Sequence, residues 1–231
     1  MSPTPPSAGQ EGQKPAGPGR PKDLGKRAAI LDVAKRLFVQ HGFDGVSMDQ
    51  IAAEAGVSKL TVYSHFGDKD SLFSAAIRAK CEEQMPAELF LQTLQGSLRE
   101  QLVVIARAFF ALITSEEAIA MQRMMMMPGT GDSHVRELFW QAGPQQTKDF
   151  FAEFLRARVA RGELRIPEIE RATSQFFCLL KGDVHIQMMC GLCGTPMPDD
   201  AERHIDATVD LFLRAYAAED APAEGSREAA A

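Results

Sequence analysis

The sequence predicts an all-α protein with a small N-terminal domain of three helices and a larger helical body. Apolar residues recur at helical spacing along most of the chain, glycine and proline separate the periodic segments, and no segment indicates a strand. The chain has 231 residues, of which 45% are hydrophobic and 24% charged, as in ordinary globular proteins. This length suffices for one large domain or two small ones.

The composition divides the chain into four segments. Residues 1–22 are rich in Pro, Gly, Ser and Gln, and we expect them to form a disordered basic arm. Residues 23–68 hold the small domain and residues 69–218 hold the body. Residues 219–231 are small and polar, which predicts a flexible tail.

The composition also excludes several classes of protein. No apolar run approaches the roughly 18 residues that span a bilayer, and the N-terminus lacks the apolar core of a secretory signal, so we expect a cytoplasmic protein without a membrane partner. In such a chain the four cysteines are not expected to form a disulfide framework. Residues 1–80 carry 11 Lys and Arg against 8 Asp and Glu, whereas the remainder carries 14 against 23. Only the front of the chain is therefore expected to meet a polyanion.

The first expected helices lie in the front of the chain. Apolar residues at helical spacing between residues 29 and 38 predict a helix that ends at Gly42. The stretch "SMDQIAAEAG" predicts a short helix over about 48–55, capped by Ser47, with Gln50 completing a capping-box pattern.

A second short helix follows at once. It is predicted over 59–65, with Ser58 as its cap and Gly67 as its end, and Asp68 caps the next helix. An isolated helix of this length is not stable, so neighbouring elements must hold it.

The body is expected to contain longer and more apolar helices. Thr114 and Glu117 form a capping-box pattern, and Gly143-Pro144 interrupts a periodic segment that is either one long helix or a broken pair. The expected segments are about 84–114 with interruptions at Pro86 and Gly96, 114–127, 132–161, 167–190 and 199–217.

The two short helices and the "AGVS" turn between them predict a helix-turn-helix. Ala52 and Gly56 are small where the helices must pack closely, and we expect Leu60 and Val62 to face inward. The other face of the second helix can then enter a major groove of DNA. The alternative is an exposed short helix of a bundle with ordinary capping serines.

The exposed side chains of this motif suit a DNA surface. Lys59 can reach guanine edges or a phosphate, and Thr61 can bond to either and offer its methyl group to thymine. Tyr63, His65 and Lys69 can donate to phosphate oxygens. Helix N-termini also favour phosphate, and two serines occupy such positions, Ser47 and Ser58.

The basic arm offers a further candidate contact. Arg20 lies in the extended stretch "GPGRPKDLGKR", and arms of this kind can place arginine in a narrow minor groove. The alternative is a solubilising linker whose charges stay in water.

The order of motifs between residues 25 and 80 is distinctive. An amphipathic helix ends in "HGF", the helix-turn-helix follows, and "VYSHFGDKDSLF" completes the block. This block resembles the N-terminal domain of TetR-family transcriptional regulators. The resemblance implies that the third helix enters the major groove and that a fourth links to an effector domain. It also implies that Ser47 touches phosphate, that Lys59 and Thr61 touch bases or nearby backbone, and that Tyr63, His65 and Lys69 grip the backbone.

The resemblance extends less specifically to the body, which is similar to the helical effector domains of this family. It implies a homodimer in which the last two long helices pair with their copies, and two half-sites read by such a dimer lie about 34–36 Å apart or a multiple of that distance. The alternative is that the same residues fill the core of one chain. The candidate interface residues are Leu179, Leu180, Val184, Ile205, Val209 and Phe212.

The resemblance further implies a repressor that binds a palindromic operator and is released by a small, largely apolar effector, without a cofactor. An effector would lie between helices of the body, where methionine gives an adaptable wall. The alternative for every residue is core packing. The candidate pocket residues are Phe109, Phe110, Ile113, Met121, Met124, Met125, Trp140, Phe150, Phe151, Phe154 and Phe177, with His134 as a second polar tip beside Trp140.

A second hypothesis concerns "HIQMMCGLCG". Cys190 and Cys193 form a C-x2-C pattern near His185, which suits a soft metal or a thiol switch. A zinc site normally needs a second ligand pair, which is not evident, so no metal ligands are predicted. The common catalytic motifs do not occur, and we expect no enzyme. A DNA-organising protein without an effector is the remaining alternative.

Overall fold

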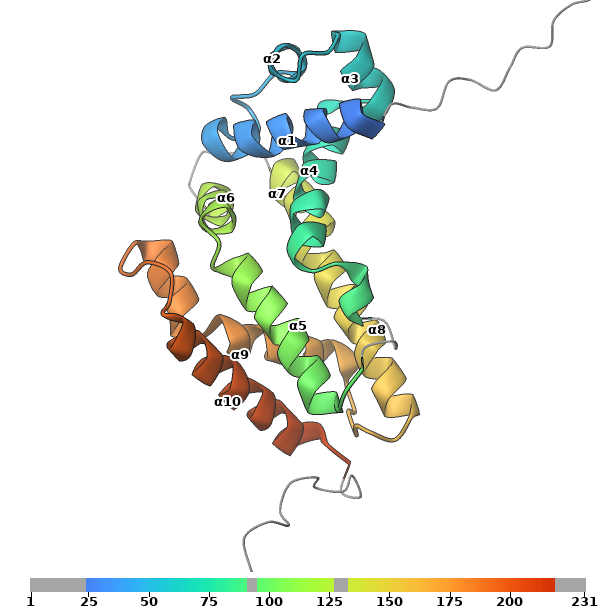
Figure 1. The fold of residues 1–231 in the computed structure, drawn as a ribbon, viewed down its shortest axis with the longest axis vertical. Coiled ribbons are helices and arrows are strands. Elements are labelled where there is room, and N and C mark those ends of the chain that lie inside the picture. Colours follow the sequence, from blue (N-terminus) through green and yellow to red (C-terminus); the bar gives the residue numbers. More distant parts are fainter. Residues whose placement is uncertain (1–23, 91–94, 127–132, 219–231) are drawn as a thin grey trace, which may run out of the picture.

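The computed structural model describes residues 24–90, 95–126 and 133–218, and within these ranges the chain is helical, as predicted (Figure 1). The arm with Arg20 and the tail at 219–231 lie outside the described residues. No described helix combines the length and the apolar character needed to cross a membrane. The elements are α1 (Leu24–His41), α2 (Met48–Glu54), α3 (Lys59–Phe66), α4 (Lys69–Gln84), a 3-10 turn η1 (Ala87–Phe90), α5 (Leu98–Ile113), α6 (Glu116–Met126), α7 (Ser133–Trp140), a π-helical turn η2 (Gln141–Gln145), α8 (Gln146–Ala160), α9 (Ile169–Cys190) and α10 (Pro198–Tyr216).

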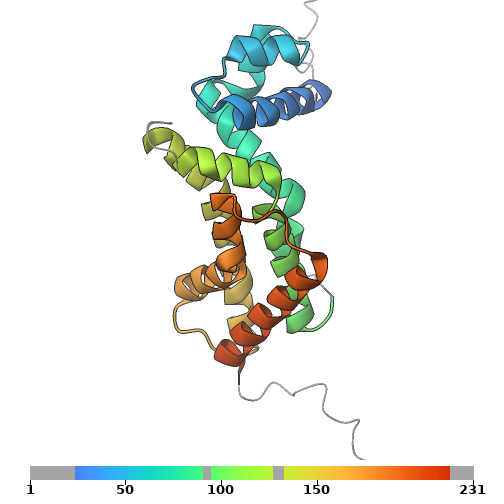
Figure 2. The same ribbon diagram turned by 90° about the vertical axis from the view of Figure 1, so that its left-hand side faces the viewer.

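Helices α1, α2 and α3 form a head at one end of the molecule, and α4 leads from it into the body (Figures 1 and 2). The head has its own apolar core, in which the rings of Phe38 and Phe73 meet edge to face with centroids 5.1 Å apart. Because Phe73 lies on α4, this helix completes the head core. Met121 of α6 and Val135 of α7 also belong to it, so the head rests directly on the body.

Short helices in the head begin at capped N-termini. The Ser47 hydroxyl accepts a hydrogen bond from the Gln50 backbone nitrogen at 3.1 Å, and Asp68 accepts one from the Ser71 backbone nitrogen at 2.7 Å. This bond lowers the pKa of the Asp68 carboxyl. The expected capping box at Ser47 is incomplete, because the Gln50 side chain instead donates to Glu54 at 3.3 Å.

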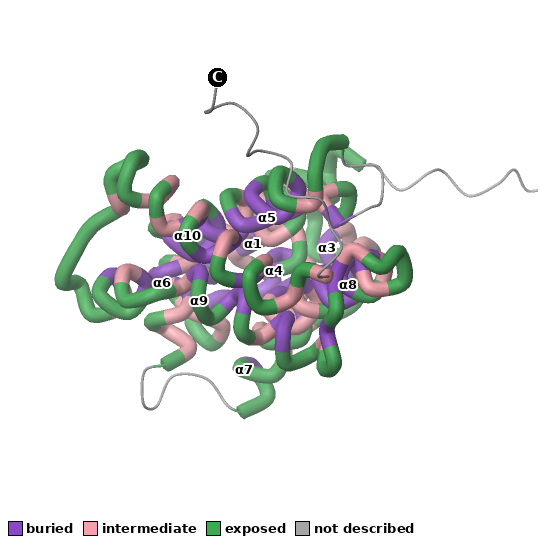
Figure 3. Tube along the Cα trace, turned by 90° about the horizontal axis from the view of Figure 1, so that it is seen from below, coloured by how far each residue is buried: buried purple, intermediate pink, exposed green. Residues whose placement is uncertain are grey.

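The body is a bundle around a second core that is rich in phenylalanine. Phe151 of α8 is fully buried, and its ring centroid lies 4.6 Å from that of Phe176 and 5.0 Å from that of Phe177 on α9. Phe212 brings α10 into the same cluster, 5.0 Å from Phe176. Seen from below, the buried parts of these helices turn toward the middle of the bundle and the exposed parts lie outside (Figure 3).

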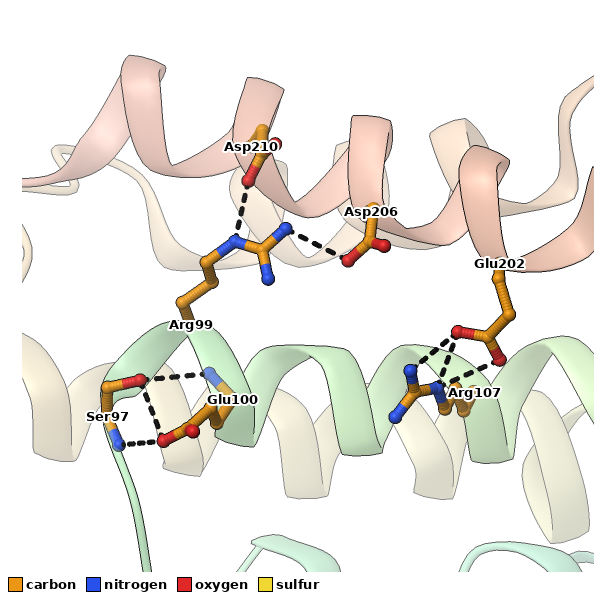
Figure 4. A network of polar contacts seen from close by, with 7 residues as sticks. All are labelled: Ser97, Arg99, Glu100, Arg107, Glu202, Asp206 and Asp210. Carbon is orange, nitrogen blue, oxygen red and sulfur yellow. Dashed lines mark hydrogen bonds and ion pairs between the residues drawn. The ribbon is translucent and has the colours of Figure 1, made fainter. Parts of the chain in front are cut away.

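Ion pairs join α5 to α10 along the outside of this core (Figure 4). Arg99 donates to Asp210 at 2.8 Å and to Asp206 at 2.9 Å. About two turns further along α5, Arg107 binds both carboxylate oxygens of Glu202, with its Nη2 at 2.6 Å from Oε2. Exposed pairs of this kind each contribute roughly 0–1 kcal/mol, so they set the register of two helices that the apolar core already holds.

Two expected boundaries of the body differ in detail. Ser97 and Glu100 form a reciprocal capping box at the start of α5, also seen in Figure 4, so the chain does break before this helix as Gly96 indicated. The predicted capping box at Thr114 is wrong. Thr114 ends α5 and its hydroxyl donates to the Phe110 carbonyl at 2.7 Å, while the Ser115 hydroxyl accepts from the Ala118 backbone nitrogen and caps α6.

Gly143-Pro144 neither ends the helix nor leaves it regular. The five-residue turn η2 is π-helical and joins α7 to α8 without a break. A π turn widens the hydrogen-bond ring locally, which accommodates proline inside a helix. A Cβ placed on Gly143 would lie 3.1 Å from Ile77 and 3.2 Å from the Cys81 sulfur, so glycine allows α4 to approach this turn closely.

Helix α9 contains an unpredicted kink at Gly182. This residue has φ 50° and ψ −164°, a conformation essentially confined to glycine. The His204 ring of α10 occupies the space beside it, where Nε2 donates to the Leu180 carbonyl at 3.0 Å. A Cβ on Gly182 would lie 3.0 Å from that ring.

Candidate DNA-binding interface

Helix α3 is held to the head by two side chains one turn apart. Val62 is fully buried and Phe66 nearly so. Because each residue advances about 100° around a helix, Leu60 and Ser64 lie on the opposite side. Leu60 is 78% exposed, so the prediction that it faces inward is wrong. Leu60 lies two residues before Val62, and residues two apart point to nearly opposite sides of a helix. This spacing was the signal that could have placed Leu60 on the exposed side.

The serine at the start of α3 builds a small polar cluster. The Ser58 hydroxyl accepts from the Thr61 backbone nitrogen at 3.1 Å and lies 2.8 Å from the Thr61 hydroxyl. Thr61 is half-buried, and because its hydroxyl is engaged with Ser58, its methyl group remains for an apolar contact. Ser64 is exposed, and its hydroxyl donates to the Thr61 carbonyl at 2.8 Å. Ser64 was missed as a candidate contact, although its spacing from Leu60 places both on the outer face.

Lys59 and Tyr63 flank this outer face. The Lys59 nitrogen lies 2.8 Å from Oδ1 of Asp49 on α2 and 6.0 Å from the centre of the Tyr63 ring. The hydrogen bond to Asp49 raises the pKa of Lys59, so this side chain carries a full positive charge at neutral pH. Tyr63 is exposed. Both side chains can swing toward a polyanion that approaches α3.

His65 and Lys69 lie at the far end of α3. His65 is half-buried beside Phe66, and its Nδ1 has no hydrogen-bond partner among the described residues. The Lys69 ammonium nitrogen lies 4.3 Å from the centre of the Phe43 ring, which is a cation–π contact. Arg27 of α1 lies 5.1 Å from the Phe66 ring centre and adds a cation that sequence analysis missed. The head thus brings hydroxyl, imidazole and cationic groups together around α3.

The candidate pocket residues separate into two sets. The phenylalanines and Ile113 lie in or against the body core, where Phe109 and Phe177 are 4.4 Å apart by ring centroid. Met121 is buried in the head core instead, and Met124 and Met125 pack against that core. These methionines belong to α6, which lies under the head, and so they cannot line the same wall as the phenylalanines.

The expected polar tips point elsewhere. Trp140 is 42% exposed, and its Nε1 donates to Gln145 at 3.2 Å on the surface of the α7–α8 segment. His134 lies 2.6 Å from Asp70 at the start of α4. Neither side chain faces the phenylalanine core.

Most candidate interface residues turn out to be core residues of one chain. Leu180 and Val209 are fully buried, and Ile205 and Phe212 are 2% exposed, which favours the alternative that they fill the core of one chain. They share the face of α9 and α10 that packs on α5 and α8. Val184 is half-buried against the same core, and Leu179 is exposed. The exposed apolar residues of these helices are Leu179, Ile186 and Leu211.

The cysteine region shows no metal site. Cys190 and Cys193 are exposed free thiols, and His185 is buried with its Nε2 3.0 Å from the Gln122 oxygen of α6. No group of three or more His, Cys, Asp or Glu side chains that could hold a metal ion occurs in the described part of the chain.

Comparisons with known proteins agree with this arrangement. Residues 30–76 match the family described as bacterial regulatory proteins, tetR family, and residues 100–218 match the AefR-like transcriptional repressor, C-terminal domain. The second match alone spans more than half of the chain.

Individual relatives cover both parts. YdeS, an HTH-type transcriptional regulator of Bacillus subtilis, is 29% identical over 153 residues, which are 64% of this chain and 71% of YdeS. ComR of Escherichia coli, an HTH-type transcriptional repressor, is 28% identical over 152 residues, 63% of this chain and 70% of ComR. The solved structure of the flavonoid-responsive regulator FrrA is 29% identical and has a TM-score of 0.67, covering 85% of this chain and all of FrrA (100%). The chain belongs to the TetR family of DNA-binding transcriptional regulators.

Proposed function

We propose that this protein is a homodimeric repressor that binds a palindromic operator through α3 and is released by a small, largely apolar effector. The observation that carries the proposal is the anchoring of α3, where two buried side chains leave Leu60, Tyr63 and Ser64 in solvent. Repression is supported by the description of the C-terminal family and by ComR, a named repressor.

The exposed groups divide by chemistry into base readers and backbone contacts. Lys59 and Thr61 keep the base-reading roles expected from their position, with the Thr61 methyl group suited to thymine. Leu60 joins them, because an exposed branched apolar side chain on the outer face also suits a thymine methyl group. The backbone contacts are Ser47, Ser58, Tyr63, His65 and Lys69, and Arg20 of the arm would enter the minor groove.

The dimer contact in this proposal uses the outer faces of α9 and α10. Leu179, Ile186 and Leu211 are exposed on these two helices, and the centre of an interface is rich in apolar side chains. Leu211→Arg is expected to shift the protein from dimer to monomer in sedimentation velocity. Val104→Arg, at an exposed position of α5, is the matched control and should leave the dimer intact. A dimer that persists in Leu211→Arg would exclude this surface.

The effector in this proposal enters the phenylalanine core of the body. Rings such as Phe109 and Phe151 can separate to admit a flat aromatic molecule, and FrrA, which is similar over both domains, is named as flavonoid-responsive. A panel of flavonoids should therefore be tested first for release of the protein from its operator. If no flavonoid releases the protein from its operator but other apolar compounds do, the effector is not a flavonoid and belongs to another class of compound.

The operator itself is the decisive test. Genomic fragments are selected by the purified protein at fixed salt and then footprinted, because affinity without a stated salt concentration has no meaning. We expect a palindromic footprint whose half-sites are about 34–36 Å apart or a multiple. Tyr63→Ala should weaken this footprint, and Lys181→Ala in the body should not. Salt-sensitive binding without a preferred site would contradict the repressor mechanism.

A further inference from the structure

A polar recess lies between α8 and α9, away from the phenylalanine core. Its volume is about 350 Å³, which is within the range of small-molecule sites. The residues around it are charged or polar except for Ala152, and they come from η2, α8 and the first half of α9. The π-helical turn supplies Gln145 at one edge, and π turns are frequent at functional sites.

One side of the recess is already neutralised. Arg156 of α8 forms ion pairs with Glu153, at 2.6 Å, and with Glu170 of α9. These three side chains satisfy one another and join the two helices. They leave little charge for a ligand.

The other side holds charges without opposite partners. Within the described ranges, Lys148 has no carboxylate within 4.0 Å. Its ammonium group instead lies 3.2 Å from the Ser174 hydroxyl and 5.3 Å from the centre of the Trp140 ring. Within the described part of the chain, Asp149 accepts an amide hydrogen bond from Gln145 at 2.9 Å and forms no ion pair. Among the described residues, the recess therefore presents one cation and one anion that have no partner of opposite charge.

A buried hydroxyl beside the recess is also without a partner in the part of the chain that the structure describes. Thr173 of α9 lines the recess and is 2% exposed, yet its Oγ1 has no hydrogen-bond partner among the described residues. Most buried polar groups in proteins are satisfied, so an orphan at the wall of a cavity calls for a partner.

We propose that this recess binds a small zwitterion that carries one carboxylate and one ammonium group. The carboxylate is held by Lys148 and the hydroxyls of Ser174 and Thr173, and the ammonium group by Asp149. A simple anion fits less well because Asp149, Glu153 and Glu170 line the same recess. This site is separate from the apolar core assigned to the effector above, and its test requires neither DNA nor that effector.

Trp140 provides the readout. It is the single tryptophan of the chain, and it stacks on the Lys148 ammonium group and bonds to Gln145 at the rim. The probes are the common α-amino acids together with 4-aminobutanoate and 6-aminohexanoate, which vary the distance between the two charges. Butanoate and butylamine serve as matched probes with one charge each. We expect saturable quenching or enhancement of tryptophan fluorescence by at least one zwitterion, with a Kd of about 1 mM or tighter.

Paired variants then assign the groups. Lys148→Met and Asp149→Asn should each weaken binding by about tenfold or more, the usual loss when a hydrogen bond to a charged group is removed. Lys181→Met and Asp183→Asn remove the same charges from α9 outside the recess and should bind as the unaltered protein does. Binding of each variant is confirmed by calorimetry, because Lys148→Met also changes the environment of Trp140.

Thr173→Val separates a ligand role from a structural one. It removes the orphan hydroxyl at constant shape, so the thermal stability without ligand should stay the same or rise, while zwitterion binding weakens. The proposal is overturned if no zwitterion binds, if butanoate or butylamine binds as tightly, or if binding is indifferent to Lys148→Met and Asp149→Asn.

Discussion

The head and the body of this protein use apolar side chains in opposite ways. In the head, the eight-residue helix α3 is fixed by Val62 and Phe66, and Leu60 stands 78% exposed on its outer face. In the body, α9 is 22 residues long and Leu180 is 0% exposed inside a core shared with three other helices. A short helix with two anchors keeps most of its surface for a partner, whereas long bundle helices commit most apolar residues to folding.

The comparison is tested most strongly at the centre of the body core. Phe151→Ala should lower the free energy of unfolding by about 3–5 kcal/mol, because it removes a ring that contacts aromatic residues on α8, α9 and α10. Val62→Ala in the head should cost less, roughly 2 kcal/mol, because a smaller side chain is lost. Denaturant unfolding at fixed protein concentration measures both. An equal loss in the two variants would remove the distinction between the cores.

The kink in α9 gives the next largest effect. Gly182→Ala should destabilise the protein by about 1–3 kcal/mol, because its backbone conformation is strained for any other residue and a Cβ would press on His204. Gly194→Ala is the matched control, since a Cβ there meets nothing within 4 Å. Thermal unfolding of the two variants should differ clearly, and a Gly182→Ala protein as stable as Gly194→Ala would mean that α9 straightens without cost.

The sequence was sufficient for the head because its signals are local. Ser58 caps α3 and Gly67 ends it, and both follow from the residue types at these positions. Leu60 was misplaced because hydrophobicity alone does not set the phase of an eight-residue helix, and two apolar residues two apart lie about 200° apart on its surface. Taking Val62 and Phe66 as the anchors fixes the phase and exposes Leu60 and Ser64.

The structure of the body was less predictable, because the burial of its residues and the bends in its helices depend on packing between segments that are distant in the sequence. Periodicity located α10, but did not show whether Val209 would face its own chain or a second copy. The kink at Gly182 and the π turn at Gly143 depend on His204 and on Ile77, which lie far away in the sequence. The polar recess joins Lys148 to Ser174 across two helices, and no spacing within either helix indicates that contact.

The outer face of α3 provides a test on DNA. Leu60→Ala should change the preference among operator variants by roughly 1 kcal/mol at one position, as expected when the apolar contact with one thymine methyl group is lost. Tyr63→Ala should weaken binding to all sequences about equally. Competition binding against a set of single-base operator variants at one salt concentration distinguishes these patterns. If Leu60→Ala weakens binding to all operator variants equally, Leu60 does not contact a base, and base reading is left to Lys59 and Thr61.

The smallest expected effect concerns pH and the contact between α6 and α9. Burial lowers the pKa of His185, and nearby Lys181 lowers it further, so the folded protein favours the neutral imidazole. The unfolded chain then binds a proton more tightly than the folded one, and stability falls as pH drops below the ordinary histidine pKa of about 6.5 until the lower folded pKa is passed. His185→Gln should flatten the stability profile in this window relative to the unaltered protein, with His41→Gln as the control for loss of an exposed imidazole. Because His185 bonds to Gln122 of α6, a profile that stays unchanged in His185→Gln would show that this contact between α9 and α6 carries no proton-linked energy.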